Sequence, residues 1–241
     1  MSEDTGVLAR DLALRLGDNQ VLRGVSFGIE PGTVLAVLGP NGAGKTSLLK
    51  VLATLLAPTG GEVRVLGRNL RDAGAALRRL IGYVAHQTFL YPQLTGWENL
   101  YFWARAYGVR KAGDRAEELL AFVGLELHAH ETVRAYSRGM QQRLALARAL
   151  AHDPRLLLLD EPYTGLDRRA TDLLDVIIRE SRPQGRTVIM TSHDPTRAIR
   201  ASDTVVVLRR GQVALLADSR DVDPALVDDA ADPSGGRMVV Q

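Results

Sequence analysis

The stretch that decides the fold is GPNGAGKT, residues 39–46. It fits the pattern G-x-x-x-x-G-K-[ST], and it lies between the apolar run GTVLAVLG and a helix expected over residues 45–56. The glycines of such a loop let backbone N–H groups point at phosphate oxygens, and the helix adds its positive N-terminal end. The sequence therefore predicts a phosphate-binding loop between a buried strand and a helix.

This loop also supplies side chains for a nucleotide and a metal ion. Lys45 is expected to reach the β- and γ-phosphates, and the Thr46 hydroxyl is expected to ligate Mg²⁺. An ordinary glycine-rich turn is the alternative, but the complete motif in its strand–helix context disfavours it. The residues predicted to bind the nucleotide here are Gly39, Pro40, Asn41, Gly42, Ala43, Gly44, Lys45, Thr46 and Ser47.

A second candidate site is LLLLDEP, residues 156–162, where a continuous apolar run ends in two carboxylates. Asp160 is placed to hold Mg²⁺ through water, and Glu161 to orient or deprotonate the attacking water. An Asp-Glu pair at the end of a strand is more often only a solvated turn. The phosphate loop about a hundred residues earlier favours the functional interpretation.

The order of the apolar runs sets the fold class. Two short strands open the chain and later strands alternate with helices, which predicts an α/β fold with a mostly parallel central sheet. The expected architecture is a P-loop NTPase core with N-terminal antiparallel β strands and an inserted α-helical subdomain at about 88–151. Residues 1–218 are expected to form this domain, and residues 219–241, acidic and rich in Pro, Gly and Ala, a flexible tail.

Composition excludes several classes of protein. The chain has 241 residues, of which 46% are hydrophobic, so it can bury a full core. Thirty basic against 28 acidic side chains leave a net charge of +2, which gives no argument for nucleic acid as a partner. There is no cysteine for a disulfide framework. The acidic N-terminus does not read as a secretory signal, and the longest apolar-rich run, LLKVLATLLAP, falls short of the ~20 residues that span a bilayer.

Four further motifs accompany these two sites in a fixed order. They are AHQ with Gln87, YSRGMQQ at residues 136–142, GLD at residues 165–167, and TSHD with His193. Alone, Gln87 or His193 would more often be a hydrogen-bonded structural residue. Together with the two sites, the motifs make residues 7–217 resemble the ATP-binding subunit of ABC transporters, and they look like that family's Q-loop, signature, D-loop and switch histidine.

The resemblance implies a set of roles. In this family two subunits form a head-to-tail dimer, in which each ATP lies between the phosphate loop of one subunit and the signature helix of the other. The implied cofactors are therefore ATP and Mg²⁺. The implied catalytic residues are Glu161, His193 and Gln87, the implied Mg²⁺ residues are Thr46, Gln87 and Asp160, and the further implied ATP contacts are Ser137, Gly139, Asp167 and Leu16.

The sequence departs from the family's commonest pattern at several positions. In the signature, Tyr136, Arg138 and Met140 stand where the family most often has Leu, Gly and Gln. Arg138 either adds a cation near the nucleotide or lies on a solvated surface, and the second interpretation is favoured. Leu16 stands where the family usually stacks an aromatic ring on adenine, so it offers apolar contact without π stacking. Tyr163, after DEP, stands where a smaller residue is common.

The motifs are most similar to those of export-type members, particularly the haem-exporter ATPase subunit of cytochrome c maturation, and after it drug- and polysaccharide-type exporters. The implied partners are a second ATPase subunit and integral membrane subunits, the latter touched by residues 89–91, and the implied location is the cytoplasmic face of the membrane as a peripheral protein. A soluble ABC ATPase acting on nucleic acid or ribosomes is disfavoured because the chain has one cassette, no heptad run and almost no net charge. A phosphate-loop kinase would not need all these motifs.

Overall fold

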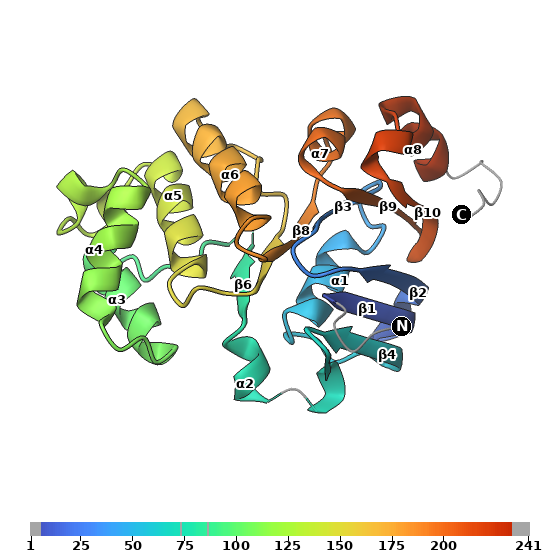
Figure 1. Ribbon diagram of the computed structural model, residues 1–241, viewed down its shortest axis with the longest axis horizontal. Coiled ribbons are helices and arrows are strands. Elements are labelled where there is room, and N and C mark those ends of the chain that lie inside the picture. The colour runs from blue at the N-terminus through green and yellow to red at the C-terminus, as the bar shows by residue number, and fades with distance from the viewer. Residues whose placement is uncertain (1–5, 73, 86, 233–241) are drawn as a thin grey trace.

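A six-stranded sheet carries the core of the molecule (Figure 1). The computed structural model describes residues 6–72, 74–85 and 87–232. The strands are β3 (Val34–Leu38), β6 (Ile81–Val84), β7 (Leu156–Leu159), β8 (Thr187–Thr191), β9 (Thr204–Arg209) and β10 (Gln212–Asp218). Their order is β10-β9-β3-β8-β7-β6, and every pair is parallel except β9 with β10. The expected α/β fold with a mostly parallel central sheet is confirmed.

A second, antiparallel sheet is built from the N-terminal strands. It contains β1 (Val7–Leu16), β2 (Asn19–Ile29), β4 (Gly60–Val65) and β5 (Arg68–Asn69), in the order β2-β1-β4-β5. The alternation of polar and apolar residues along β2 buries one face and leaves the other in solvent, as is typical of an antiparallel sheet. The predicted N-terminal antiparallel strands are therefore confirmed.

Helix α1 (Lys45–Leu52) lies between the two sheets. Its apolar residues share one buried cluster with Leu35 and Val37 of β3 and with the inward face of the antiparallel sheet. The alternate residues of β3, Val34 and Ala36, belong to a second cluster with the helices on the opposite face. Both faces of β3 are thus covered, which explains why its sequence reads as a continuous apolar run.

The other helices are α2 (Ala75–Arg78), α3 (Gly96–Ala106), α4 (Ala112–Phe122), α5 (Arg138–Ala149), α6 (Arg168–Ser181), α7 (Pro195–Ala201) and α8 (Pro224–Ala231). Helices α3, α4 and α5 pack together on the side of the molecule away from the antiparallel sheet (Figure 1). Here α3 to α5 are called the helical block. Thr95 and Glu98 form a capping box that starts α3. The limits of the inserted subdomain, about 88–151, stay a prediction.

The chain after residue 218 differs from the expectation of a flexible tail. Residues 224–231 form α8, whose Val227 and Ala230 are buried against the second cluster. Asp223 caps the helix by accepting the backbone N–H of Leu226 at 2.8 Å, and Pro224 occupies the first turn. These are ordinary helix-start signals, which the acidic, Pro-rich composition outweighed in the sequence interpretation. That expectation is therefore wrong for residues 224–231, and residues 233–241 lie outside the described part.

No helix in the described part of the chain combines the length and apolar character required to span a bilayer.

Candidate functional site

The candidate site lies at the carboxyl ends of four neighbouring parallel strands. The phosphate loop follows β3, Ser192 and His193 follow β8, Asp160 and Glu161 follow β7, and Gln87 lies beyond β6. Open α/β sheets bind ligands in the crevice outside this edge. The sheet order therefore brings together motifs that lie as much as 154 residues apart in the chain, from Gly39 to His193.

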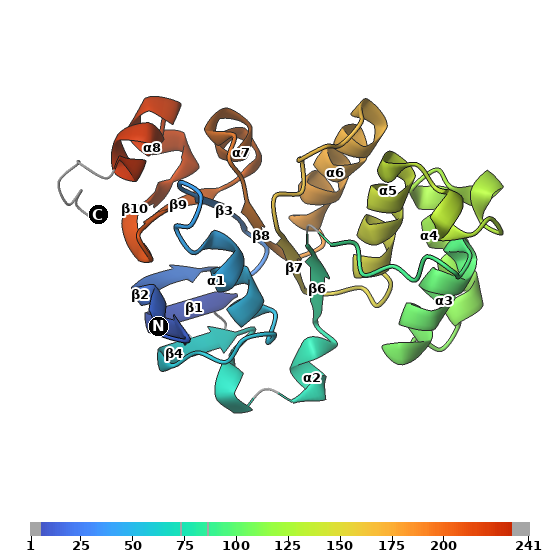
Figure 2. The same cartoon turned by 180° about the vertical axis from the view of Figure 1, so that it is seen from behind.

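The phosphate loop has a backbone that requires its glycines. Gly39 and Gly44 have φ values of 132° and 105°, and Gly39 also leaves no room for a Cβ because the carbonyl oxygen of Leu208 lies against it. Figure 2 shows this loop, between β3 and α1, beside α8. Glycine at these positions thus allows the loop conformation in which backbone N–H groups can point at phosphate oxygens.

Lys45 is buried within this loop, with 5% of its surface exposed. Its Nζ donates hydrogen bonds to the carbonyl oxygens of Gly39 at 2.7 Å and Pro40 at 3.2 Å. Burial lowers the pKa of the Lys45 ammonium, and the charges of Glu161 and Asp160 oppose that shift. The cation is therefore held at the position where phosphate oxygens are expected, with the loop carbonyls as its partners.

Asp160 is fixed by two hydroxyl groups. The Oδ1 atom of Asp160 accepts from Thr46 Oγ1 at 3.0 Å and from Thr191 Oγ1 at 2.8 Å, and the residue is only 7% exposed. The backbone N–H of Glu161 donates to the same Thr191 oxygen at 2.7 Å. Thr191 is a site residue that the sequence reasoning missed, although it lies two residues before His193 at the end of a buried strand.

The residues around Asp160 fit a magnesium ion that is shared with phosphates. Thr46 and Asp160 offer adjacent hard oxygen donors, and Mg²⁺ commonly takes one or two carboxylates together with substrate phosphates and water. The described residues contain no cluster of three His, Cys, Asp or Glu side chains that could hold a metal alone.

Glu161 and His193 face one another across the end of the sheet. His193 Nδ1 lies 3.6 Å from Glu161 Oε2, and both side chains are in part accessible to solvent. Glu161 has a φ of 49°, a strained conformation for a non-glycine residue that clusters at functional sites. His193 also lines a cavity of about 310 Å³ with Gly39, Pro40 and Asn41. His193 is therefore close both to the carboxylate of Glu161 and to the phosphate loop.

Gln87 is exposed on a larger cavity of about 680 Å³ that Asp160 and Glu161 also line. Within the described residues no hydrogen bond joins Gln87 to Asp160. The structure thus brings Gln87 to the same cavity as the acidic pair, and its ligation of Mg²⁺ stays a prediction.

The start of α5 and the loop before α6 contact each other within this chain. Ser137 caps α5 by accepting the N–H of Met140 at 3.2 Å. A Cβ at Gly139 would lie 2.5 Å from Oδ2 of Asp167, so this glycine gives clearance to Asp167 of the same chain. The guanidinium of Arg138 lies against Gly165 in the same way. In the described part, no hydrogen bond joins Ser137, Gly139 or Asp167 to the phosphate loop.

Three departures from the family's pattern have structural explanations. The buried Tyr136 donates from its hydroxyl to the carbonyl of His128 at 2.7 Å, and Met140 packs against the core of the helical block. Tyr163 donates to Asp175 Oδ1 at 2.6 Å, and Arg197 lies over its ring at 4.6 Å from the centroid. Tyr163 thereby links the loop after Glu161 to α6 and α7, since Asp175 and Arg197 belong to those helices.

Leu16 lies at the end of β1, opposite Asn19, and is 42% exposed. The other strand of this hairpin reaches the phosphate loop, because a Cβ at Gly44 would lie 2.8 Å from Cδ2 of Leu22. The hairpin is thus beside the loop, and the contact of Leu16 with adenine stays a prediction.

A phosphate loop, an acidic pair and a histidine at one sheet edge define a P-loop nucleoside triphosphatase. The ABC transporter family matches residues 22–164, which is more than half of the chain. The chain therefore belongs to the ABC transporter family, as an ATP-binding subunit with ATPase activity.

Its relatives are named for different processes, in both export and import. Nod factor export ATP-binding protein I of Rhizobium etli is 37% identical over 227 residues, which are 93% of this chain and 71% of that protein. A Fe(3+) ions import ATP-binding protein of Brucella abortus is 36% identical over 90% of this chain and 62% of its own length. A cytochrome c biogenesis ATP-binding export protein of Cupriavidus metallidurans is 39% identical over 79% and 90%, respectively.

Solved structures show the same architecture. A dimeric ATP-binding cassette in a post-hydrolysis state, bound to ADP and Pi, superposes with a TM-score of 0.80. It is 28% identical in sequence, and the match covers 90% of this chain and 100% of that chain. The likeness in fold therefore extends over nearly the whole described molecule.

Proposed function

We propose that this ATPase subunit binds Mg-ATP at the phosphate loop, hydrolyses it in a head-to-tail dimer and powers export through a separate membrane subunit. One observation carries the proposal: the Asp160–Thr46 pair, which suits a shared Mg²⁺, lies next to Glu161, which is 3.6 Å from His193. Phosphate binding, charge neutralisation and a base for water are thus available at one sheet edge.

Each side chain has one task in this mechanism. Lys45 gives its hydrogen bonds to the β- and γ-phosphates in place of the loop carbonyls. Thr46, Asp160 and Gln87 would hold Mg²⁺, which when bound would supply positive charge to the phosphate oxygens. Glu161 accepts a proton from water as the water oxygen bonds to the γ-phosphorus and the bond to the leaving oxygen of ADP breaks. His193 holds the γ-phosphate beside Glu161.

The dimer gives a further role to Ser137, Gly139 and Asp167, beyond their contacts within one chain. Ser137 is exposed at the start of α5, where backbone N–H groups and the helix dipole favour an anion. In a two-fold arrangement Ser137, Gly139 and Asp167 of one subunit meet the ATP on the other subunit's phosphate loop. The solved relative described above is itself a dimer, which supports this arrangement.

Export is the direction that we propose, with haem for cytochrome c biogenesis as a particular candidate cargo. Two of the three relatives named above are export proteins, and one of these serves cytochrome c biogenesis. A drug- or polysaccharide-type exporter is the alternative. The membrane partner would hold the subunit at the cytoplasmic face, and the half-exposed Phe89 and Tyr91 form part of that contact. The neighbouring genes test this assignment. A gene for a multi-span membrane protein beside this one would support a membrane partner, and genes for cytochrome c assembly proteins would support haem as the cargo.

The experiment for the reaction is Glu161→Gln. The amide keeps the shape of the site but cannot take the proton, so hydrolysis should fall by about 10²–10⁴-fold. ATP should still bind and should now hold the two subunits together, which gel filtration with and without ATP measures. If the Glu161→Gln variant hydrolyses ATP at the normal rate, Glu161 is not the group that accepts the proton from water.

A further inference from the structure

A groove of about 610 Å³ lies between α6 and α7. The two helices contact each other, and they are neighbours in both views of the ribbon (Figure 1 and Figure 2). Sites for small molecules commonly have volumes of about 300–1,000 Å³. No residue of the phosphate loop is among the described residues that line the groove. The groove therefore has the size of a ligand site and is separate from the site for ATP.

Arginine dominates the walls of this groove. The cations that line it are Arg179, Arg182, Arg197 and Arg200. Among the described lining residues the acids are Asp175 and Asp194, so four positive charges face two negative ones. Both carboxylates already accept hydrogen bonds, Asp175 from the Tyr163 hydroxyl at 2.6 Å and Asp194 from the backbone N–H of Arg197 at 3.0 Å. The groove thus carries positive charge that its own acids do not balance.

The four arginines differ in how far their charge is already used. Arg182 Nε donates to both carboxylate oxygens of Asp203 at 3.1 Å, and Arg179 pairs only with the adjacent, exposed Glu180 at 3.2 Å. Arg197 and Arg200 are exposed, and neither forms an ion pair within the part of the chain that the structure describes. Because they are three residues apart on α7, they lie on one face of the helix. Two guanidinium groups are therefore available to an anion.

Contacts between three segments hold the walls of the groove in place. The guanidinium of Arg197 lies over the ring of Tyr163, 4.6 Å from its centroid, and the Tyr163 hydroxyl is bonded to Asp175 of α6. Arg182 donates to the carbonyl oxygen of Ala201 at 3.0 Å and so joins the end of α6 to the end of α7. A ligand would meet walls that are already ordered, which lowers the entropy lost on binding.

The charge of the helix ends explains only part of this arrangement. Cations in the last turn of a helix interact favourably with its dipole, which accounts for Arg179 of α6 and Arg200 of α7. Arg197 lies in the first turn of α7, where the dipole disfavours a cation. Its charge is therefore not placed there to stabilise the helix, and an anion in the groove would compensate for it.

We propose that this groove is an anion site for a ligand that carries two or more phosphate groups, which are bound by Arg197 and Arg200 of α7 and by Arg179 of α6. Arginine presents a planar fork of N–H donors that matches phosphate oxygens, and such charged hydrogen bonds are among the stronger ones. Because the guanidinium groups come from two helices, they can meet separate phosphates of one ligand. The site goes beyond the proposed function and does not depend on it.

Inorganic tripolyphosphate is the probe, and calorimetric titration of the full chain measures its binding. The chain is first saturated with Mg²⁺ and a non-hydrolysable ATP analogue, so that the phosphate loop is occupied. We expect tripolyphosphate still to bind. Arg197→Gln combined with Arg200→Gln should weaken this binding by about tenfold or more and leave the affinity for the ATP analogue unchanged. No binding to the saturated chain, or equal binding by the double variant, would overturn the proposal.

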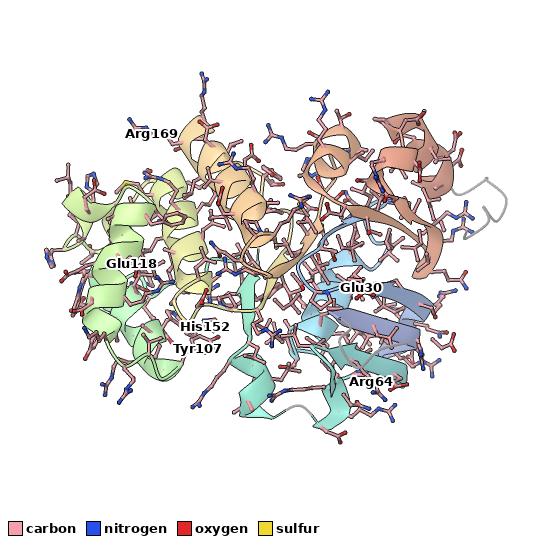
Figure 3. All side chains as sticks on the ribbon, viewed as in Figure 1. Glu30, Arg64, Tyr107, Glu118, His152 and Arg169 are labelled. Atoms are coloured by element: carbon pink, nitrogen blue, oxygen red, sulfur yellow. The ribbon has the colours of Figure 1, made fainter. Side chains whose placement is uncertain are left out.

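A matched pair of arginines at the start of α6 controls for general attraction by charge. Arg168→Gln combined with Arg169→Gln removes the same two positive charges from exposed positions, and Figure 3 labels Arg169 at this end of the helix. These variants should bind tripolyphosphate as the unchanged chain does. If they weaken binding as much as the groove variants, the attraction is not specific to the groove and the proposal fails. A thermal melt shows that each variant is folded.

The geometry of the donors has its own test. Arg197→Lys combined with Arg200→Lys keeps both charges but loses the planar forks, so it should bind tripolyphosphate less tightly than arginine and more tightly than glutamine. Lysine variants as weak as the glutamine variants would mean that the positive charge in the groove does not hold the ligand, which contradicts the proposal.

Two sources could supply such phosphates, a soluble molecule or a lipid headgroup. Vesicles of phosphatidylcholine with and without phosphatidylinositol bisphosphate distinguish them, with co-sedimentation as the measurement. Binding that requires the phosphorylated lipid, Arg197 and Arg200, and that exceeds the binding of tripolyphosphate, would assign the groove to a headgroup. Tighter binding of tripolyphosphate would assign it to a soluble ligand. Either result supports the phosphate site, and binding of neither probe contradicts it.

Discussion

The Thr191 hydroxyl donates to Asp160 at 2.8 Å and so fixes the carboxylate that follows β7. Thr191→Val removes the hydroxyl and leaves a branched side chain of the same size. Losing a hydrogen bond to a charged group costs about 1.5–3 kcal/mol, so we expect ATP hydrolysis to fall by about tenfold or more as Asp160 turns away. Phosphate release at saturating ATP measures the effect.

Thr191→Ser is the control, since it keeps the hydroxyl and loses only a methyl group. Its rate should stay close to that of the unchanged protein. A valine variant as fast as the serine variant would mean that the orientation of Asp160 does not depend on Thr191.

Lys45→Ala should weaken nucleotide binding itself. The Lys45 ammonium is buried with two loop carbonyls as partners, and a phosphate is a stronger partner because the hydrogen bond is then charged on both sides. Removing it costs about 1.5–3 kcal/mol, or about 10–100-fold in affinity for ATP. Titration with a fluorescent ATP analogue measures this. Unchanged affinity would contradict the assignment of the phosphate loop.

His152 gives a pH dependence of stability. Burial, the largest cause, lowers its pKa from 6.5 to about 4, and Nε2 donates to the carbonyl of Ile81 at 3.0 Å. Below pH 6.5 the unfolded chain takes up a proton that the folded chain excludes. The free energy of unfolding should therefore fall between pH 6.5 and 4, by as much as about 3 kcal/mol from this group.

Urea unfolding at a series of pH values tests this prediction. His152→Gln keeps a donor for Ile81 but does not titrate, so its stability should decline less over the same interval. Parallel curves for the two proteins would show that another group causes the decline.

Ser137→Ala and Arg138→Ala test separately the two residues at the start of α5. Ser137→Ala removes the cap, which costs about 1 kcal/mol of unfolding free energy. It should also slow ATP hydrolysis, because in the proposed head-to-tail dimer Ser137 meets the ATP of the other subunit. Arg138→Ala should slow hydrolysis without weakening ATP binding, because the guanidinium lies against Gly165 and lines the cavity of Glu161. If the Arg138→Ala variant hydrolyses ATP at the normal rate, Arg138 is a surface residue without a role in the reaction.

The sheet and the phosphate loop could be predicted because their signals are local. Neighbouring residues carry each signal: the glycines before Lys45, the apolar run before Asp160, and the periodicity of each strand and helix. Thr191 could not be found in this way, because its role is a contact with Asp160, 31 residues earlier in the chain. The pairing of Tyr163 with Asp175 likewise depends on how α6 packs. Helix α8 carried local signals, and composition was given too much weight.

The burial of α1 between the two sheets has a consequence for genetics. Leu48, Leu49 and Leu52 are all 0% exposed and hold the helix that begins at Lys45. A Leu→Ala change in such a core costs about 2–5 kcal/mol out of a total stability of about 5–15 kcal/mol. A screen for alleles that lose transport will therefore recover Leu49 as well as Lys45. Alleles at Leu49 will be temperature-sensitive, whereas those at Lys45 will fail at every temperature.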